Sequence, residues 1–225
     1  GLLFENTPGL TPKQQAFVRS RDEFADAGEL TDLPAIIKAV QPTVMIGTST
    51  VHNAFTEAAI KEMAKHADRP IIFPISNPTE KIEATPADLI KWTNGKALVA
   101  TGIPSATVAY QGIDYQIGQA NNALIYPGVG FGALAVNARI INDEMLAAAA
   151  HALGGLVDVK APGAPVLPPV SQLTDFSKQV AIAVAQSAID QGLAQTDLSA
   201  EQAVAAMHWQ PEYQPFDELL ANYSK

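Results

Sequence analysis

The stretch PIIFPISNP, residues 70–78, gives the clearest indication of fold in this chain of 225 residues. Its first six residues form a short apolar run rich in branched side chains, which is typical of a strand buried on both faces of a sheet. The run ends directly in Ser76, Asn77 and Pro78, residue types that favour turns. A buried strand that ends in a polar turn predicts one unit of a parallel sheet.

Two further apolar runs, residues 43–46 and 97–100, stand on either side of this strand along the chain. Apolar residues at helical spacing predict helices that alternate with the strands, over residues 33–40, 55–66 and from residue 85 onward. The alternation predicts an α/β fold, a partial doubly wound (Rossmann-like) parallel sheet. The chain opens on the apolar run GLLF, and we expect this to be the tail of a strand or turn whose beginning is missing. We assign residues 1–135 to the later part of such a domain.

The remaining residues, 136–225, are predicted to form a helical C-terminal portion of the same domain. Helical spacing of apolar residues favours helices over residues 136–153, 175–193 and 199–207. Between the first two, the segment KAPGAPVLPP at residues 160–169 carries four prolines and predicts an extended loop.

Charge and composition exclude several classes of function. The chain has 14 Lys and Arg against 23 Asp and Glu, a formal net charge of −9, which disfavours nucleic acid and membrane surfaces as partners. It has no Cys, and this excludes disulfides, thiolate metal sites and cysteine nucleophiles. The absence of Cys agrees with a reducing compartment, no signal peptide is recognisable, and we expect a cytoplasmic protein.

Candidate binding residues follow the predicted strands, since ligands of open α/β sheets bind beyond the carboxyl ends of the strands. Residues 47–50, 76–79 and 101–105 are small, hydroxylated or amide-bearing, and none is charged. They suit a flat polar ligand held by backbone N–H groups and amides, although the same residue types are also common in ordinary turns.

Two later segments are open to two interpretations each. Asn121 and Asn122 either cap a helix or strand end, or place an amide on a substrate carboxylate without adding charge. The glycines at 128, 130 and 132 have GxGxG spacing where a phosphate loop needs GxGxxG, so we predict a closely packed, glycine-rich helix start.

General acids, bases and metal ligands are not evident. The four His residues are scattered without ligand spacing, and Glu57, Glu62 and Asp88 are predicted to lie on solvated helix faces. The chain is therefore expected to line a binding site with no catalytic residue and no metal ligand of its own.

Several segments together resemble the carboxyl-terminal half of the malic enzymes. They are PIIFPISNPTEKIEATPADLIKWTNGKALVATGIPS at 70–105, GQANNALIYPGVGFG at 118–132 and HWQPEY at 208–213. Within that family, the segments most similar to the bacterial malolactic branch are IGTST at 46–50, DYQIGQANNALIYPG at 114–128 and PGAPVLPP at 162–169.

The resemblance implies roles for individual residues. Asn77 would contact the substrate and border the nicotinamide, and Asn121, with Asn122 beside it, would bind malate. The implied cofactor-binding residues are Gly47, Thr48, Ser49, Ile75, Ser76 and Asn77. The family's Tyr and Lys acid/base pair, its carboxylate metal ligands and its first glycine fingerprint would lie upstream of Gly1.

The activity implied is conversion of malate to lactate and CO₂ with NAD and Mn²⁺ or Mg²⁺, in a full-length parent that is a homo-oligomer. The isolated chain is expected to be inactive. Two alternatives stay open: an oxidative NAD-dependent malic enzyme that releases pyruvate, CO₂ and NADH, and a non-catalytic nucleotide-binding module.

Overall fold

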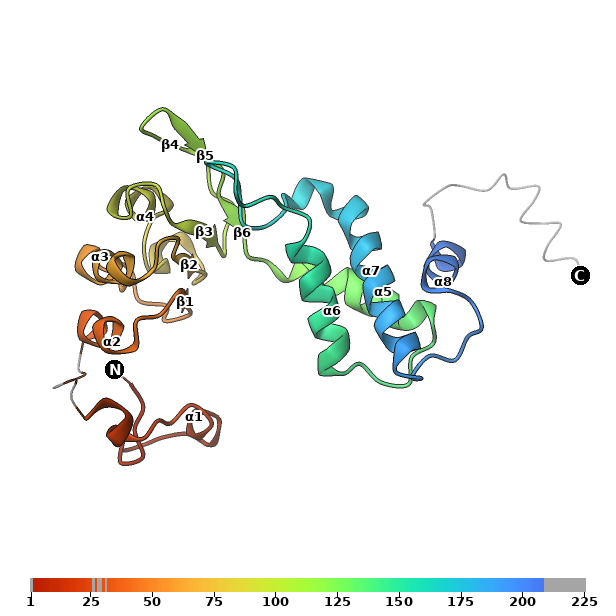
Figure 1. Ribbon diagram of the computed structural model, residues 1–225, viewed down its shortest axis with the longest axis horizontal. Helices are drawn as coiled ribbons and strands as arrows, with labels where there is room; N and C mark the ends of the chain where they lie inside the picture. The colour runs from red at the N-terminus through yellow and green to blue at the C-terminus, as the bar shows by residue number, and fades with distance from the viewer. Residues whose placement is uncertain (1, 26, 28–29, 31, 209–225) are drawn as a thin grey trace, which may run out of the picture. The chain divides into compact units, whose positions relative to one another are not determined.

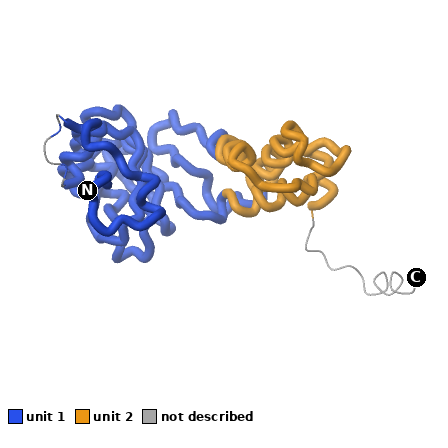
Figure 2. The backbone as a smooth tube through the Cα atoms, turned by 90° about the horizontal axis from the view of Figure 1, so that it is seen from below, with its two compact units in different colours: residues 1–124, 153–174 blue, residues 125–152, 175–225 orange. Residues whose placement is uncertain are grey.

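The computed structural model describes residues 2–25, 27, 30 and 32–208, and divides into two compact units (Figure 2). Unit 1 comprises residues 1–124 and 153–174, and unit 2 comprises residues 125–152 and 175–225. All the strands found among the described residues lie in unit 1.

A four-stranded parallel sheet forms the centre of unit 1. Its strands are β1 (Val44–Gly47), β2 (Ile71–Pro74), β3 (Leu98–Thr101) and β6 (Gly118–Gln119), and their order across the sheet is β1-β2-β3-β6. The predicted parallel α/β fold is confirmed, and the first three strands match the three apolar runs to within a residue or two. The two-residue strand β6 was not predicted, because it has no apolar run.

Three helices connect or precede these strands, namely α2 (Leu33–Val40), α3 (Glu57–His66) and α4 (Pro86–Trp92). Each begins after a side-chain cap, in which Asp32, Thr56 or Thr85 accepts a hydrogen bond from a backbone N–H of the first turn. The cap at Thr56 explains why α3 begins two residues later than the predicted helix.

The helices cover one face of the sheet, on which Ile72 and Val99 are buried. Ile72 and Val99 share a core with residues of all three helices, including Ile37, Ile60 and Leu89. Figure 1 shows the three helices on the same side of the strands. Strand side chains alternate between faces, and on the opposite face Val44 and Ile46 of β1 are 46% and 58% exposed. Coverage by α2–α4 is therefore one-sided.

A β-hairpin between β3 and β6 was also not predicted. Strands β4 (Val108–Tyr110) and β5 (Ile113–Tyr115) pair antiparallel, and Gln111 and Gly112 between them have φ of 50° and 77°. Two left-handed residues in a two-residue loop make a tight hairpin turn.

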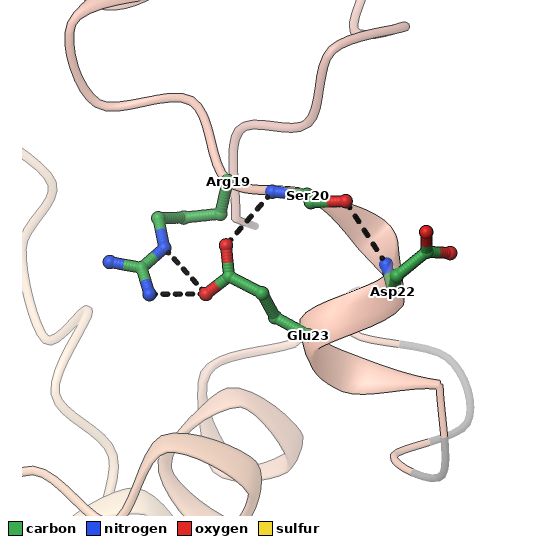
Figure 3. Close-up of polar contacts among 4 residues, drawn as sticks. All are labelled: Arg19, Ser20, Asp22 and Glu23. Carbon is green, nitrogen blue, oxygen red and sulfur yellow. Dashed lines mark hydrogen bonds and ion pairs between the residues drawn. The ribbon is translucent and has the colours of Figure 1, made fainter.

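The N-terminal segment contains two short helical turns, α1 (Pro12–Gln15) and a 3₁₀ turn (Arg21–Phe24). Figure 3 shows the start of the second turn, where the Ser20 hydroxyl accepts from the Asp22 N–H and the Ser20 N–H donates to Glu23 Oε1 at 3.2 Å. Arg19 Nε also donates to Glu23 Oε2, at 3.0 Å. These are local contacts of an exposed turn.

The described part of unit 2 is helical, and one predicted boundary in it is wrong. Its helices are α5 (Tyr126–Ala135), α6 (Asp143–Gly154), α7 (Leu173–Asp190) and α8 (Ala200–Met207), of which α6 and α7 each have two residues in unit 1. The helix predicted from residue 136 begins only at Asp143. Asn137, in a left-handed conformation with φ of 52°, ends α5, and Asn142 Oδ1 accepts from the Met145 N–H to start α6.

The glycines of α5 fit the predicted closely packed helix. A Cβ on Gly128 would lie 2.6 Å from Val180 Cβ, and one on Gly132 would lie 2.3 Å from the carbonyl oxygen of Ala181, both on α7. Gly128 and Gly132 therefore allow α5 and α7 to approach each other, whereas a Cβ on Gly130 would meet nothing within 4 Å. Residues 209–213 of the HWQPEY segment lie outside the described residues.

None of the helices in the described part of the chain combines the length and apolar character that a membrane span requires.

Candidate functional site

The four parallel strands end at one edge of the sheet, and the predicted site residues follow them there. Thr48 follows β1, Ile75 to Asn77 follow β2, and Asn121 lies two residues after β6. Neighbouring strands lie about 4.8 Å apart, so the backbones that carry Asn77 and Asn121, two strand positions apart, are separated by about 10 Å across the sheet. This edge is the candidate site.

A buried carboxylate that the sequence analysis did not single out lies under this edge. Glu83 is 0% exposed. Its Oε1 accepts from the Ser49 N–H at 2.7 Å, the Ser49 hydroxyl at 2.9 Å and the Ser76 hydroxyl at 2.5 Å. Its Oε2 faces the Ser76 N–H at 3.4 Å. One side chain thus joins the residues after β1 to the residues after β2.

Hydrogen bonding keeps Glu83 ionised in spite of its burial. Burial alone would raise its pKa, but the hydrogen bonds from Ser76 and Ser49 and from the Ser49 N–H outweigh burial, so the pKa lies below its ordinary value of 4.5. Among the described residues, no Lys, Arg or His forms an ion pair with it. The negative charge is therefore held by neutral donors alone.

The two serine hydroxyls extend this network to the backbone. While each hydroxyl donates to Glu83, Ser49 Oγ accepts from the Val51 N–H at 3.1 Å and Ser76 Oγ accepts from the Thr50 N–H at 2.9 Å. The Ile75 N–H also donates to the Gly47 carbonyl at 3.0 Å. The segment after β1 is consequently fixed at three successive residues, 49–51.

Gly47 is required by the close approach of Glu83. A Cβ at this position would lie 2.6 Å from Glu83 Cδ and 2.8 Å from Phe55 Cζ. Both neighbours are buried, Phe55 at 6% exposure. The glycine therefore lets the buried carboxylate lie directly beneath the end of β1.

The predicted cofactor-binding residues divide into two groups. Thr48 and Asn77 are exposed, and their side chains form no hydrogen bond with any other described residue. Ser76 is 5% exposed, and its hydroxyl, like that of Ser49, is engaged by Glu83. Ile75 is half-buried, and the Asn77–Pro78 peptide bond is cis. Thr48 and Asn77 are thus presented outward, while the serines hold their backbone.

Asn121 caps a short helical turn, which is the first of its two predicted interpretations. Its amide N–H groups are still available for the second, a contact with a substrate carboxylate. Its Oδ1 accepts from the Ala123 N–H at 2.9 Å and so starts the 3₁₀ turn Asn122–Leu124. This orients the amide, whose two Nδ2 hydrogens remain as donors on an exposed side chain. Such donors suit a carboxylate. Asn122 is also exposed, at the first position of the turn.

The sequence model of the malic enzyme NAD-binding domain matches residues 1–189. The chain belongs to the malic enzyme NAD-binding domain family. The edge that carries Thr48, Asn77 and Asn121 is thus the carboxyl edge of the sheet in a domain of this family.

Individual relatives support this membership. The domain is 62% identical over 214 residues to the malolactic enzyme of Lactiplantibacillus plantarum, and 45% identical over 221 residues to NAD-dependent malic enzyme 3 of Bacillus subtilis. The matches cover 95% and 96% of this chain but only 39% of each relative. The chain therefore spans about two fifths of the length of these relatives.

A solved structure agrees with the fold. The malic enzyme of Pyrococcus horikoshii superposes with a TM-score of 0.61 at 28% sequence identity, over 77% of this chain and 36% of that one.

The carboxylates on α3 form local ion pairs. Glu57 pairs with Lys61 at 2.6 Å, Glu62 pairs with Lys65 at 2.5 Å and with His66 at 3.3 Å, and these partners lower the pKa of both Glu residues. No group of three or more His, Asp or Glu residues in the described part of the domain is placed to hold a metal ion.

The local sequence contains no signal for Glu83, which stands in the polar stretch TEKIEATP, residues 79–86. It lies two residues before Thr85, the cap of α4, and its neighbours Ile82 and Ala84 are buried in the folded domain.

Proposed function

We propose that this chain is the NAD-binding part of a malolactic enzyme that converts malate to lactate and CO₂. The observation that carries the proposal is the 62% identity over 95% of the chain to the malolactic enzyme of Lactiplantibacillus plantarum, against 45% to an NAD-dependent malic enzyme. In this proposal residues 1–135 supply the cofactor edge, and residues 136–225 are its helical extension.

The roles within the chain follow from what each side chain has to offer. Asn77, which is exposed, borders the nicotinamide, and Thr48, also exposed, lies along the dinucleotide. Gly47, Ser49, Ile75 and Ser76 form the backbone beneath the cofactor. NAD held at this edge would supply the hydride acceptor for C2 of malate and, after CO₂ is lost, the hydride donor for pyruvate.

The Asn121 amide donates to a malate carboxylate, and Asn122 lies beside it. An amide holds the carboxylate without a second charge, so it orients malate and pyruvate alike. Retaining pyruvate until it is reduced requires such an orienting contact, together with exclusion of water.

The remaining parts are assigned to the full-length protein on the family resemblance. They are the proton-transferring groups and the Mn²⁺ or Mg²⁺ ligands, a cytoplasmic location and a homo-oligomeric state. No step through the metal is derived from this chain.

The test uses the full-length protein with malate, NAD⁺ and Mn²⁺, following NADH by absorbance and lactate by a separate assay. We expect lactate and CO₂ in equal amounts, with little NADH in solution. Pyruvate with stoichiometric NADH and no lactate would reassign the protein to the oxidative malic enzymes, the alternative favoured by its 45% identity to the Bacillus subtilis protein.

A further inference from the structure

We propose that Glu83 is a positioning residue for the dinucleotide, whose buried carboxylate sets the segments after β1 and β2 so that Thr48 and Asn77 face the cofactor. The inference deepens the proposed function, because it rests on this edge being where NAD binds. Glu83 itself is 0% exposed, so in this proposal it acts through the residues that it holds and not by direct contact with the cofactor.

The geometry of the network carries this inference. Glu83 accepts from both segments at once, through the N–H and hydroxyl of Ser49 and the hydroxyl of Ser76, at 2.5–2.9 Å, with the Ser76 N–H at 3.4 Å. Thr48 lies directly before one of these serines, and Asn77 lies directly after the other. The two exposed side chains are therefore each one residue from an anchored serine.

The chemistry requires a carboxylate. A carboxylate only accepts, so both hydroxyls can donate to it while each of them accepts a backbone N–H, from Val51 or from Thr50. Hydrogen bonds to an ionised acceptor are roughly twice as strong as neutral ones. Replacing Glu83 by Gln keeps its volume but presents an NH₂ group to the Ser76 N–H, where two donors would meet.

Glu83 is itself held by the surrounding backbone. Its carbonyl accepts from the Phe55 N–H at 3.0 Å, and the neighbouring Ile82 carbonyl accepts from the Asn53 N–H at 3.1 Å. The backbone of Glu83 is therefore hydrogen-bonded to the loop after Val51, while its side chain is hydrogen-bonded to the two strand ends. Both sets of contacts fix the position of the carboxylate.

The experiment compares Glu83→Gln with the unmodified full-length protein. Direct titration with NAD⁺ by calorimetry gives the affinity, and steady-state kinetics give KM and kcat. We expect about tenfold weaker NAD⁺ binding and a KM for NAD⁺ raised by a similar factor, with kcat at saturating NAD⁺ reduced less than threefold. If Glu83 serves packing alone, NAD⁺ affinity and KM should not change, because Gln has nearly the same volume and preserves the packing.

A matched control shows whether the loss of NAD⁺ affinity is specific to Glu83 or follows from removing any carboxylate of the domain. Glu57→Gln removes an exposed carboxylate paired with Lys61 on α3, and NAD⁺ affinity should not change. If Glu83→Gln does not fold, as judged by circular dichroism and thermal unfolding, Ser49→Ala decides the matter. That variant removes one donor to Glu83 without uncovering the charge, and we expect three- to tenfold weaker NAD⁺ binding.

The outcomes are distinguishable from failure of the proposed function. If the unmodified protein binds no NAD⁺, both proposals fall together. If it binds NAD⁺ and the folded Glu83→Gln or Ser49→Ala variant binds it equally well, the positioning role is refuted, whichever product the enzyme forms.

Discussion

Replacing Gly47 by Ala should destabilise the protein, because the added methyl group has no space. The new Cβ would lie 2.6 Å from Glu83 Cδ, 2.8 Å from Glu83 Cγ and 2.8 Å from Phe55 Cζ, distances well inside normal contact. Neither neighbour can move toward solvent, since Phe55 is 6% exposed and Glu83 is held by both serines. Overpacking of a well-packed site costs about 1–3 kcal/mol, and we expect Gly47→Ala to fall in the upper half of that range.

The measurement is urea unfolding of the full-length protein, with NAD⁺ affinity measured on the same samples. Gly130→Ala is the matched control, since a Cβ at Gly130, within α5, would meet nothing within 4 Å. Ala is a better helix former than Gly, so the control should be neutral or more stable by up to about 1 kcal/mol. Equal unfolding free energies for Gly47→Ala and the unmodified protein would show that the contact between Gly47 and Glu83 is not as close as described.

Further predictions concern the substrate, the pH dependence and the isolated chain. In the full-length protein, Asn121→Ala should lower kcat/KM for malate, with a loss of transition-state stabilisation of about 1–3 kcal/mol, as expected when a polar partner is removed. An unchanged kcat/KM would show that Asn121 does not contact the substrate. Because the pKa of Glu83 is depressed in the folded state, its stabilising contribution is present above the ordinary value of 4.5 and is lost as pH falls through the lower folded value. The difference in unfolding free energy between the unmodified protein and Glu83→Gln should therefore shrink as the pH of a urea series is lowered below about 4.5; a difference independent of pH would contradict this. Finally, the isolated chain should not turn over malate with NAD⁺ and Mn²⁺, as a coupled lactate and NADH assay would reveal.

The sequence predicted the parts of the fold that depend on local pattern. The apolar runs that became β1, β2 and β3 are followed by turn residues, so the edge with Thr48 and Asn77 could be located from the amino-acid pattern alone. Strand β6 escaped notice because Gly118 and Gln119 form a strand only through pairing with β3. Its apolar content is too low for a pattern to appear.

The errors and omissions have tertiary causes. The helix start predicted at residue 136 was wrong because Asn137 adopts a left-handed conformation, which apolar periodicity does not report. The role of Glu83 depends on partners 34 and 7 residues away, Ser49 and Ser76, and such partners meet only in the folded sheet. The roles of Asn77 and Asn121 in binding stay predictions.

The order of the strands has a consequence for how the domain is synthesised. Val44 of β1 pairs with Ile71 of β2, and Ile71 pairs in turn with Leu98 of β3, 27 positions further on in both cases. Each strand thus finds its neighbour in the segment made just before it, so that the contact order of the sheet is low for a parallel architecture. As the chain leaves the ribosome, β2 can pair with β1, and β3 can then pair with β2. Each new strand therefore lacks its later partner only until the next helix and strand have been synthesised.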